Sequence, residues 1–119
     1  EEVATIAPYD GKLLELHYRT SKNTAASSNQ ATWKLYKIDK ASVVNTTNEV
    51  ELDSQTVTGP TNAASGAGNF VKVTFDSDAA FSAGDLLAIS VDHSVDTTDS
   101  NTKFYITTIW EYNISSISQ

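Results

Sequence analysis

The chain has 119 residues, a length typical of one domain built around a single hydrophobic core. Its 15 acidic and 8 basic residues give a formal net charge of −7, and no two basic residues adjoin. The sequence therefore lacks the positive stripe that nucleic-acid binders use on phosphates, and anionic membrane surfaces are disfavoured for the same reason. The absence of cysteine excludes disulfides and thiolate metal sites, and no apolar run is long enough to cross a bilayer.

The hydrophobic pattern repeats every two residues, and no window keeps helical spacing for three turns. The first expected strand covers 3–7 and ends at Pro8 and the turn pair Asp10-Gly11. The second covers 12–20. Strict alternation places its side chains on two faces, with Leu14, Leu16 and Tyr18 inside and Glu15, His17 and Arg19 outside.

The middle of the chain continues this pattern. A strand is expected over 32–39, with Trp33 and Leu35 on one face and Lys34, Tyr36 and Ile38 on the other. A turn at 45–48 separates it from a weaker strand over 50–57, which Gly59-Pro60 ends.

Three further segments complete the expected strands: 71–75, 81–91 and 104–114. Within 81–91, Gly84-Asp85 supplies a turn, and Leu87, Ile89 and Val91 form an inner face. Polar loops are expected over 21–30, 61–69 and 92–102, because these stretches contain little that could be buried.

Seven or eight strands without a helix to make parallel crossovers predict an all-β fold, an antiparallel two-sheet sandwich. Long connections such as 21–30 and 61–69 favour a jelly-roll or Greek-key type over a simple meander. We expect residues 1–119 to form one domain. The chain contains no methionine and begins Glu1-Glu2-Val3, so we also expect it to be a processed protein or a piece of a longer one.

No residue pattern predicts a catalytic, cofactor-binding or metal-binding site. His17 alternates outward between charged neighbours, and the trio Asp92-His93-Ser94 lacks the strained G-x-S-x-G turn of a hydrolase nucleophile. Acidic residues gather over 76–85 and 92–99, but neither group follows the spacing of a calcium loop. We therefore predict a protein that is not an enzyme and needs no cofactor.

The aromatic residues divide between the core and the surface. Trp33, Phe104 and Trp110 fall in register with Leu and Ile and are expected to be buried. Tyr36 and Tyr105 lie opposite those inner sets, where a tyrosine offers contact area with a polar tip. Together with Ile109 and Glu111, they form the candidate interface.

Three segments carry a resemblance to a known family: Ile6-Ala7-Pro8-Tyr9-Asp10-Gly11-Lys12-Leu13, the segment 81–91 (FSAGDLLAISV), and Ile109-Trp110-Glu111-Tyr112-Asn113. In this order, and over almost the whole chain, they resemble virion domains of tailed phages. These domains are β-sandwich modules of tail-fibre, baseplate and capsid-surface proteins, notably in marine phages that infect cyanobacteria and related hosts.

The resemblance implies a structural or attachment role in the phage particle, as a capsid-surface (decoration) domain or a tail appendage. It also implies other virion proteins as partners and a symmetric homo-oligomer, with a trimer favoured. The alternative is a carbohydrate-binding module or receptor-binding fibre tip, in which Tyr36 or a loop tyrosine stacks on a host-surface glycan and acidic loops hold calcium. A hydrolase would need His93 in a pocket beside a serine.

Overall fold

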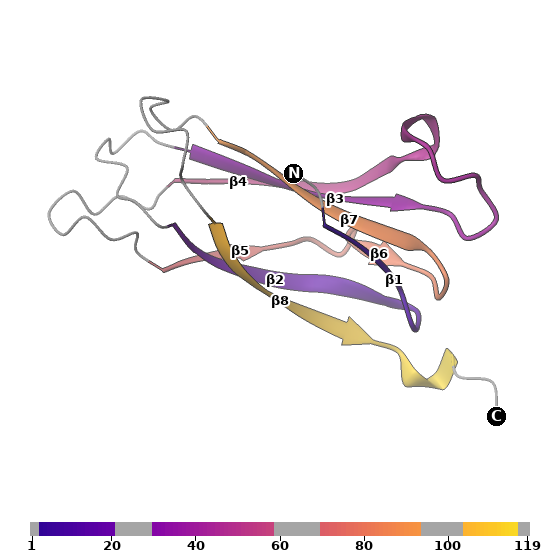
Figure 1. Cartoon of the computed structure of the whole chain (residues 1–119). Helices are drawn as coiled ribbons and strands as arrows, with labels where there is room; N and C mark the ends of the chain where they lie inside the picture. Colours follow the sequence, from indigo (N-terminus) through magenta and orange to yellow (C-terminus); the bar gives the residue numbers. More distant parts are fainter. Residues whose placement is uncertain (1–2, 21–29, 59–69, 94–103, 117–119) are drawn as a thin grey trace, which may run out of the picture.

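The computed structural model describes residues 3–20, 30–58, 70–93 and 104–116, which form eight strands in two antiparallel sheets (Figure 1). The predicted all-β two-sheet sandwich is confirmed. The helices of the described ranges are two single 3-10 turns, η1 (Thr46–Asn48) and η2 (Ile114–Ser116). The described residues therefore contain no helix that could span a bilayer.

The first sheet has the order β1-β7-β3-β4. Its strands are β1 (Val3–Ile6), β7 (Leu86–His93), β3 (Gln30–Ile38) and β4 (Val50–Thr58). β3 and β4 follow each other in the chain and pair as a hairpin. β7 lies between β1 and β3 in the sheet, although it comes much later in the sequence. Crossing connections of this kind exclude a simple meander.

The second sheet is built around β2 (Gly11–Thr20). One edge of β2 pairs along its whole length with β8 (Phe104–Tyr112). Its other edge is shared, because β6 (Ala80–Phe81) pairs near the start of β2 and β5 (Val71–Thr74) pairs further along. β8 therefore lies beside β2 on one side of the molecule (Figure 1).

The core lies between the two sheets. Trp33 of β3 is 2% exposed, and its ring lies 5.0 Å from Tyr18 of β2 and 5.7 Å from Phe104 of β8. Burial raises the pKa of the Tyr18 hydroxyl, and the neighbouring Trp33 indole partly offsets this by lowering it. Trp110 is half-buried and packs against Phe81 at 5.5 Å. The predicted core position of Trp33 is confirmed, and Trp110 lies at the margin of the same core.

The predicted inner face of β2 is wrong at one residue. The pairing with β8 shifts between Leu13 and Glu15, so Leu14 has no residue opposite it. This bulge moves the alternation by one position. Leu13 is consequently fully buried with Leu16 and Tyr18, while Leu14 is only half-buried.

A second register shift occurs in the first sheet. The pairing of β3 with β4 shifts between Leu35 and Tyr36, where Leu52 of β4 has no residue opposite it. The alternation of β3 is also wrong at Ile38, which it places outside and which is buried at the end of the strand. Residues 21–29, 59–69 and 94–103, which contain most of the three expected loops, lie outside the described residues.

Candidate functional site

Three of the four predicted contact residues lie on the outer face of β8. Tyr105 is 60% exposed and Ile109 is 36% exposed, and the Glu111 carboxylate also faces outward. Tyr36 is half-buried on β3, in the other sheet. The structure therefore places Tyr105, Ile109 and Glu111 along one strand, but it does not bring Tyr36 to them.

The outer face continues from β8 onto β2. Tyr105 pairs with Arg19, Ile109 with Glu15, and Glu111 with Lys12. The last pair forms a surface ion pair, with Lys12 Nζ at 3.7 Å from Glu111 Oε1. The apolar side chains of β8 are therefore bordered on one side by charged side chains of β2, an arrangement that resembles the apolar centre and polar rim of protein interfaces.

His17 belongs to this charged border. Its Nε2 lies 3.1 Å from Glu15 Oε1, and Lys72 Nζ lies 3.6 Å from Glu15 Oε2. The hydrogen bond with His17, assisted by Lys72, lowers the pKa of the Glu15 carboxyl. The His17 ring also packs edge-on against Phe70 at 5.0 Å. These contacts link β2 to the start of β5, and among the described residues the hydrogen-bond partner of His17 is a carboxylate.

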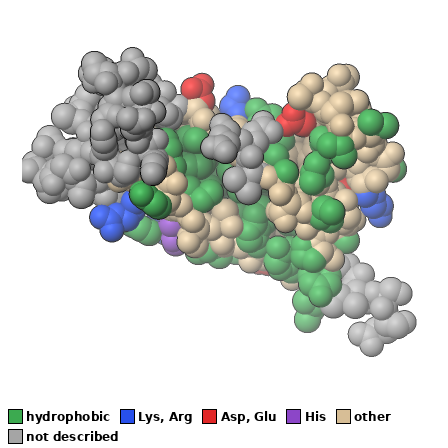
Figure 2. All heavy atoms as spheres, viewed as in Figure 1, with side chains coloured by type: hydrophobic (Ala, Val, Ile, Leu, Met, Phe, Trp, Pro, Cys, Tyr) green, Lys and Arg blue, Asp and Glu red, His purple; other side chains and the backbone are tan. Residues whose placement is uncertain are grey.

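Exposed apolar side chains concentrate around β8. Ten large hydrophobic residues are exposed in the described structure, and five of them lie within ten positions of the sequence. These five are Tyr105, Ile106, Ile109, Tyr112 and Ile114. Figure 2 shows hydrophobic side chains gathered at the lower right of the molecule, over the C-terminal part of β8 and η2.

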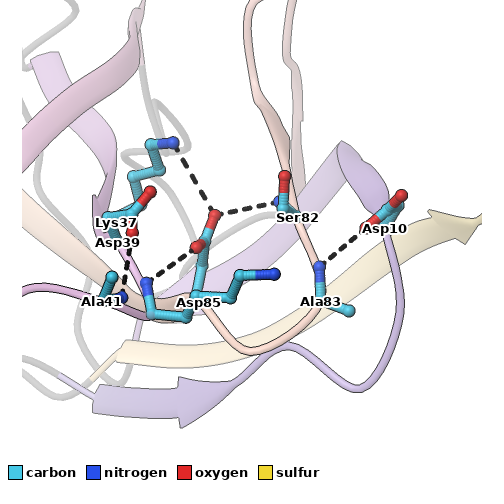
Figure 3. A network of polar contacts seen from close by, with 8 residues as sticks. Asp10, Lys37, Asp39, Ala41, Ser82, Ala83 and Asp85 are labelled. Carbon is cyan, nitrogen blue, oxygen red and sulfur yellow. Dashed lines mark hydrogen bonds and ion pairs between the residues drawn. The ribbon is translucent and has the colours of Figure 1, made fainter.

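A buried carboxylate, which the sequence suggested only as a turn residue, fixes the adjoining end of the sandwich (Figure 3). Asp85 is fully buried and accepts hydrogen bonds from the backbone N–H of Lys40 (3.1 Å) and of Ser82 (2.9 Å). Lys37 Nζ lies 3.7 Å from its Oδ2. The carboxylate thus joins the end of β3 to the turn between β6 and β7.

Asp10 fixes the same turn from the other side. Its Oδ1 accepts a hydrogen bond from the backbone N–H of Ala83 at 2.8 Å (Figure 3). Within this turn Gly84 adopts a φ of 90°, a conformation that favours glycine. The sequence signalled the turn through Gly84-Asp85, but alternation contains no signal for the contacts that cross between segments.

Asp53 and Asp76 are held together by a shared neighbour and by a direct hydrogen bond. Gln55 Nε2 donates to Asp53 Oδ2 and to Asp76 Oδ2, both at 3.2 Å, and the backbone N–H of Asp76 donates to Asp53 at 2.8 Å. No group of three potential metal ligands occurs within the described ranges. The His93 side chain and Ser94 lie outside the described residues.

The aromatic contacts do not form a flat platform in the described residues. Their ring planes meet at angles between 45° (Tyr18 with Phe104) and 84° (Trp33 with Phe104). Sugar stacking across several coplanar rings therefore has no basis in this part of the structure.

No protein-family model matches the sequence, and no curated protein matches it.

Proposed function

We propose that this chain is a structural domain of a tailed-phage particle, located in the extracellular virion and assembled with copies of itself and with other virion proteins. The virion assignment rests on the resemblance carried by residues 6–13, 81–91 and 109–113. The two-sheet sandwich is compatible with a capsid-surface or tail-appendage domain. The single observation that carries the self-association is the apolar outer face of β8.

The composition of this face supports a protein partner. Tyr105 and Ile109 point to the same side of β8, and each is bordered on β2 by a charged residue. Tyrosine is enriched at the centre of protein interfaces, where it offers a large contact area with a polar tip. A charged border favours correct orientation of the partner, because it disfavours arrangements that oppose like charges.

The position of β8 at a sheet edge supports side-to-side packing. β8 has nine residues and, within the described structure, pairs on one side only, with β2. It carries a single charge, Glu111, whereas the edge strand β4 carries Glu51 and Asp53. Long edges with few charges are favourable sites of association, and native proteins otherwise protect them with charge or cover. The family resemblance favours a trimer as the closed assembly.

The solution mass of the chain tests this proposal. Light scattering coupled to size-exclusion chromatography is expected to give a closed oligomer, and the double variant Tyr105→Ala, Ile109→Ser is expected to give monomer. Truncating a central interface tyrosine costs about 2 kcal/mol or more, which is roughly a 30-fold loss of affinity. A monomeric wild type, or a double variant with unchanged mass, would contradict the proposed surface.

A matched control separates this surface from apolar exposure in general. Val43 and Val44 are 71% and 69% exposed in the connection between β3 and β4, away from β8. The double variant Val43→Ser, Val44→Ser is expected to keep the wild-type mass. Dissociation of this control as well would show that assembly depends on exposed apolar area without regard to β8.

A further inference from the structure

The backbone of β8 presents hydrogen-bonding groups along an outer edge. β8 pairs with β2 along one edge, and no strand of the described residues pairs with its other edge. Asn113, directly after β8, donates its backbone N–H to the Asp10 carbonyl oxygen before β2 at 2.7 Å. Backbone groups of successive strand residues point alternately to the two edges of the strand. Those of Thr107 therefore face β2, whereas those of Ile106 and Thr108 point away from it.

The first sheet does not fully cover the inward face of β8. Tyr18 of β2 and Ile106 of β8 lie opposite each other in the pairing, so their side chains share the inward face of the second sheet. Tyr18 is 1% exposed, but Ile106 is 41% exposed. The cover supplied by the first sheet therefore ends between β2 and β8. A further strand beside β8 would bury Ile106, which the fold of one chain leaves in contact with solvent.

The other long edge strand, β4, has protection that β8 lacks. β4 carries Glu51 and Asp53, and the backbone N–H of Asp76, just after β5, donates to the Asp53 carboxylate at 2.8 Å. This side of the sandwich is therefore closed by charge and by a contact between the sheets. β8 carries one carboxylate, Glu111, near its end. In a chain with a net charge of −7, contact between two copies is least opposed at the long edge with fewest carboxylates.

The sequence of β8 complements itself when two copies run antiparallel. Residues that lie opposite each other must share a face, and a two-fold axis at Thr107 meets this condition. On the outer face, this register places Tyr105 of one copy opposite Ile109 of the other. On the inward face, it places Phe104 opposite Trp110. Aromatic residues paired with β-branched or other aromatic residues across two strands stabilise a sheet.

We propose that two copies of this chain pair their β8 strands antiparallel around a two-fold axis at Thr107, so that the second sheet continues from one copy into the other. This inference rests on the proposed self-association and specifies its geometry. The two Glu111 side chains lie on opposite sides of the axis, about 27 Å apart along the strands, and therefore do not oppose each other. A trimer, which the family resemblance favours, has no two-fold axis and would contradict this pairing but not self-association.

A disulfide across the axis tests the pairing in the full chain, which has no cysteine of its own. Because the backbone groups of Thr107 face β2, the two Thr107 residues would form a non-hydrogen-bonded pair with Cα atoms about 4.5 Å apart. A disulfide can span this distance. Under mild oxidation, Thr107→Cys is expected to form a covalent dimer at least about tenfold faster than two control variants, because only its thiols lie within disulfide reach.

The two controls test the edge and the register. Ser54→Cys replaces an exposed residue of the acidic edge strand β4, and Glu111→Cys lies on β8 but far from the axis. Equal cross-linking rates for Thr107→Cys and Ser54→Cys overturn the pairing. A faster reaction of Glu111→Cys than of Thr107→Cys overturns the axis at Thr107.

Light scattering of the wild type separates failure of this inference from failure of the proposed function. A dimer, or an assembly with an even number of chains, together with selective cross-linking of Thr107→Cys supports both. An oligomer in which Thr107→Cys reacts no faster than Ser54→Cys contradicts the β8 pairing and leaves self-association intact. A monomer with cross-linking at the control rate contradicts both.

Proline variants separate edge pairing from folding. The N–H of Ile106 points away from β2, so Ile106→Pro removes a hydrogen bond only between copies. This variant is expected to be a monomer with native Trp33 fluorescence. Thr107→Pro removes a hydrogen bond to β2 and is expected to lower the melting temperature. Ile106→Ala keeps the N–H and is expected to keep the wild-type mass. A folded Ile106→Pro variant with unchanged mass overturns the proposal.

Discussion

Removal of the buried Asp85 carboxylate should destabilise the fold more than removal of any surface charge. Asp85→Ala removes a fully buried carboxylate and leaves the part-buried backbone N–H groups of Lys40 and Ser82 without their acceptor. A hydrogen bond to a charged group contributes about 1.5–3 kcal/mol, so two of them set the expected loss at about 3–6 kcal/mol. The ammonium of Lys37, at 3.7 Å, also loses its partner, which adds to the loss because only 26% of its side chain is exposed.

Urea denaturation followed by the fluorescence of buried Trp33 measures this loss. Because small domains are stable by about 5–15 kcal/mol, Asp85→Ala should unfold at much lower urea and still show a folded baseline in the cold. Asp85→Asn should lose about half as much, because its amide oxygen accepts from one N–H while its amide nitrogen faces the other. Asp78→Ala, at an exposed carboxyl, should change stability by less than about 0.5 kcal/mol. The reasoning is refuted if Asp85→Ala and Asp78→Ala unfold at the same urea concentration.

Two further predictions concern β2. Gly11→Ala should destabilise the chain by about 1–3 kcal/mol, because the new Cβ would overlap the Glu111 carbonyl oxygen and force β8 away. An unchanged melting temperature would contradict this close approach. Glu15 has a pKa below its ordinary value of 4.5, so its contribution to stability is present above pH 4.5 and is lost as the pH falls through the lowered value. The melting temperatures of Glu15→Gln and wild type should therefore differ at neutral pH and converge in acid. A difference that stays constant with pH would show that His17 and Lys72 do not stabilise the carboxylate.

Alternation was sufficient to predict the strands because each residue needs only its own polarity to select a face. Trp33, Leu35 and Leu87 are accordingly buried on their predicted inner faces, and Phe104 packs against the same core. On β8 the expectation is met only in part, because Ile106, Tyr112 and Ile114 are exposed. Alternation no longer predicts the buried face beyond a β-bulge, where one strand contains an extra residue relative to its partner. The bulge at Leu14 depends on pairing with β8, which lies about ninety positions further along the chain, so no local pattern contains it.

The candidate interface was partly accessible to the same reasoning. Tyr105, Ile109 and Glu111 share a face because they are separated by even numbers of residues on one strand. Tyr36 could not be placed relative to them, since polarity does not say which sheet a strand joins. The contacts of the buried Asp85 carboxylate escaped prediction for a related reason. They join the end of β3 to the turn between β6 and β7, which only the tertiary structure brings together.

The outward-facing side chains of β2 and β8 lie on the same face of one sheet but differ in polarity, and this difference bears on function. β2 presents charged or titratable side chains there, at Lys12, Glu15, His17 and Arg19. Strand propensity therefore does not require apolar residues on this face. Tyr105 and Ile109 are exposed and do not belong to the core cluster, so filling the core does not require them either. Replacing them should change the free energy of unfolding by only about 0.5 kcal/mol while altering the solution mass. A variant that loses both stability and assembly would instead place these two side chains in the fold of the single chain.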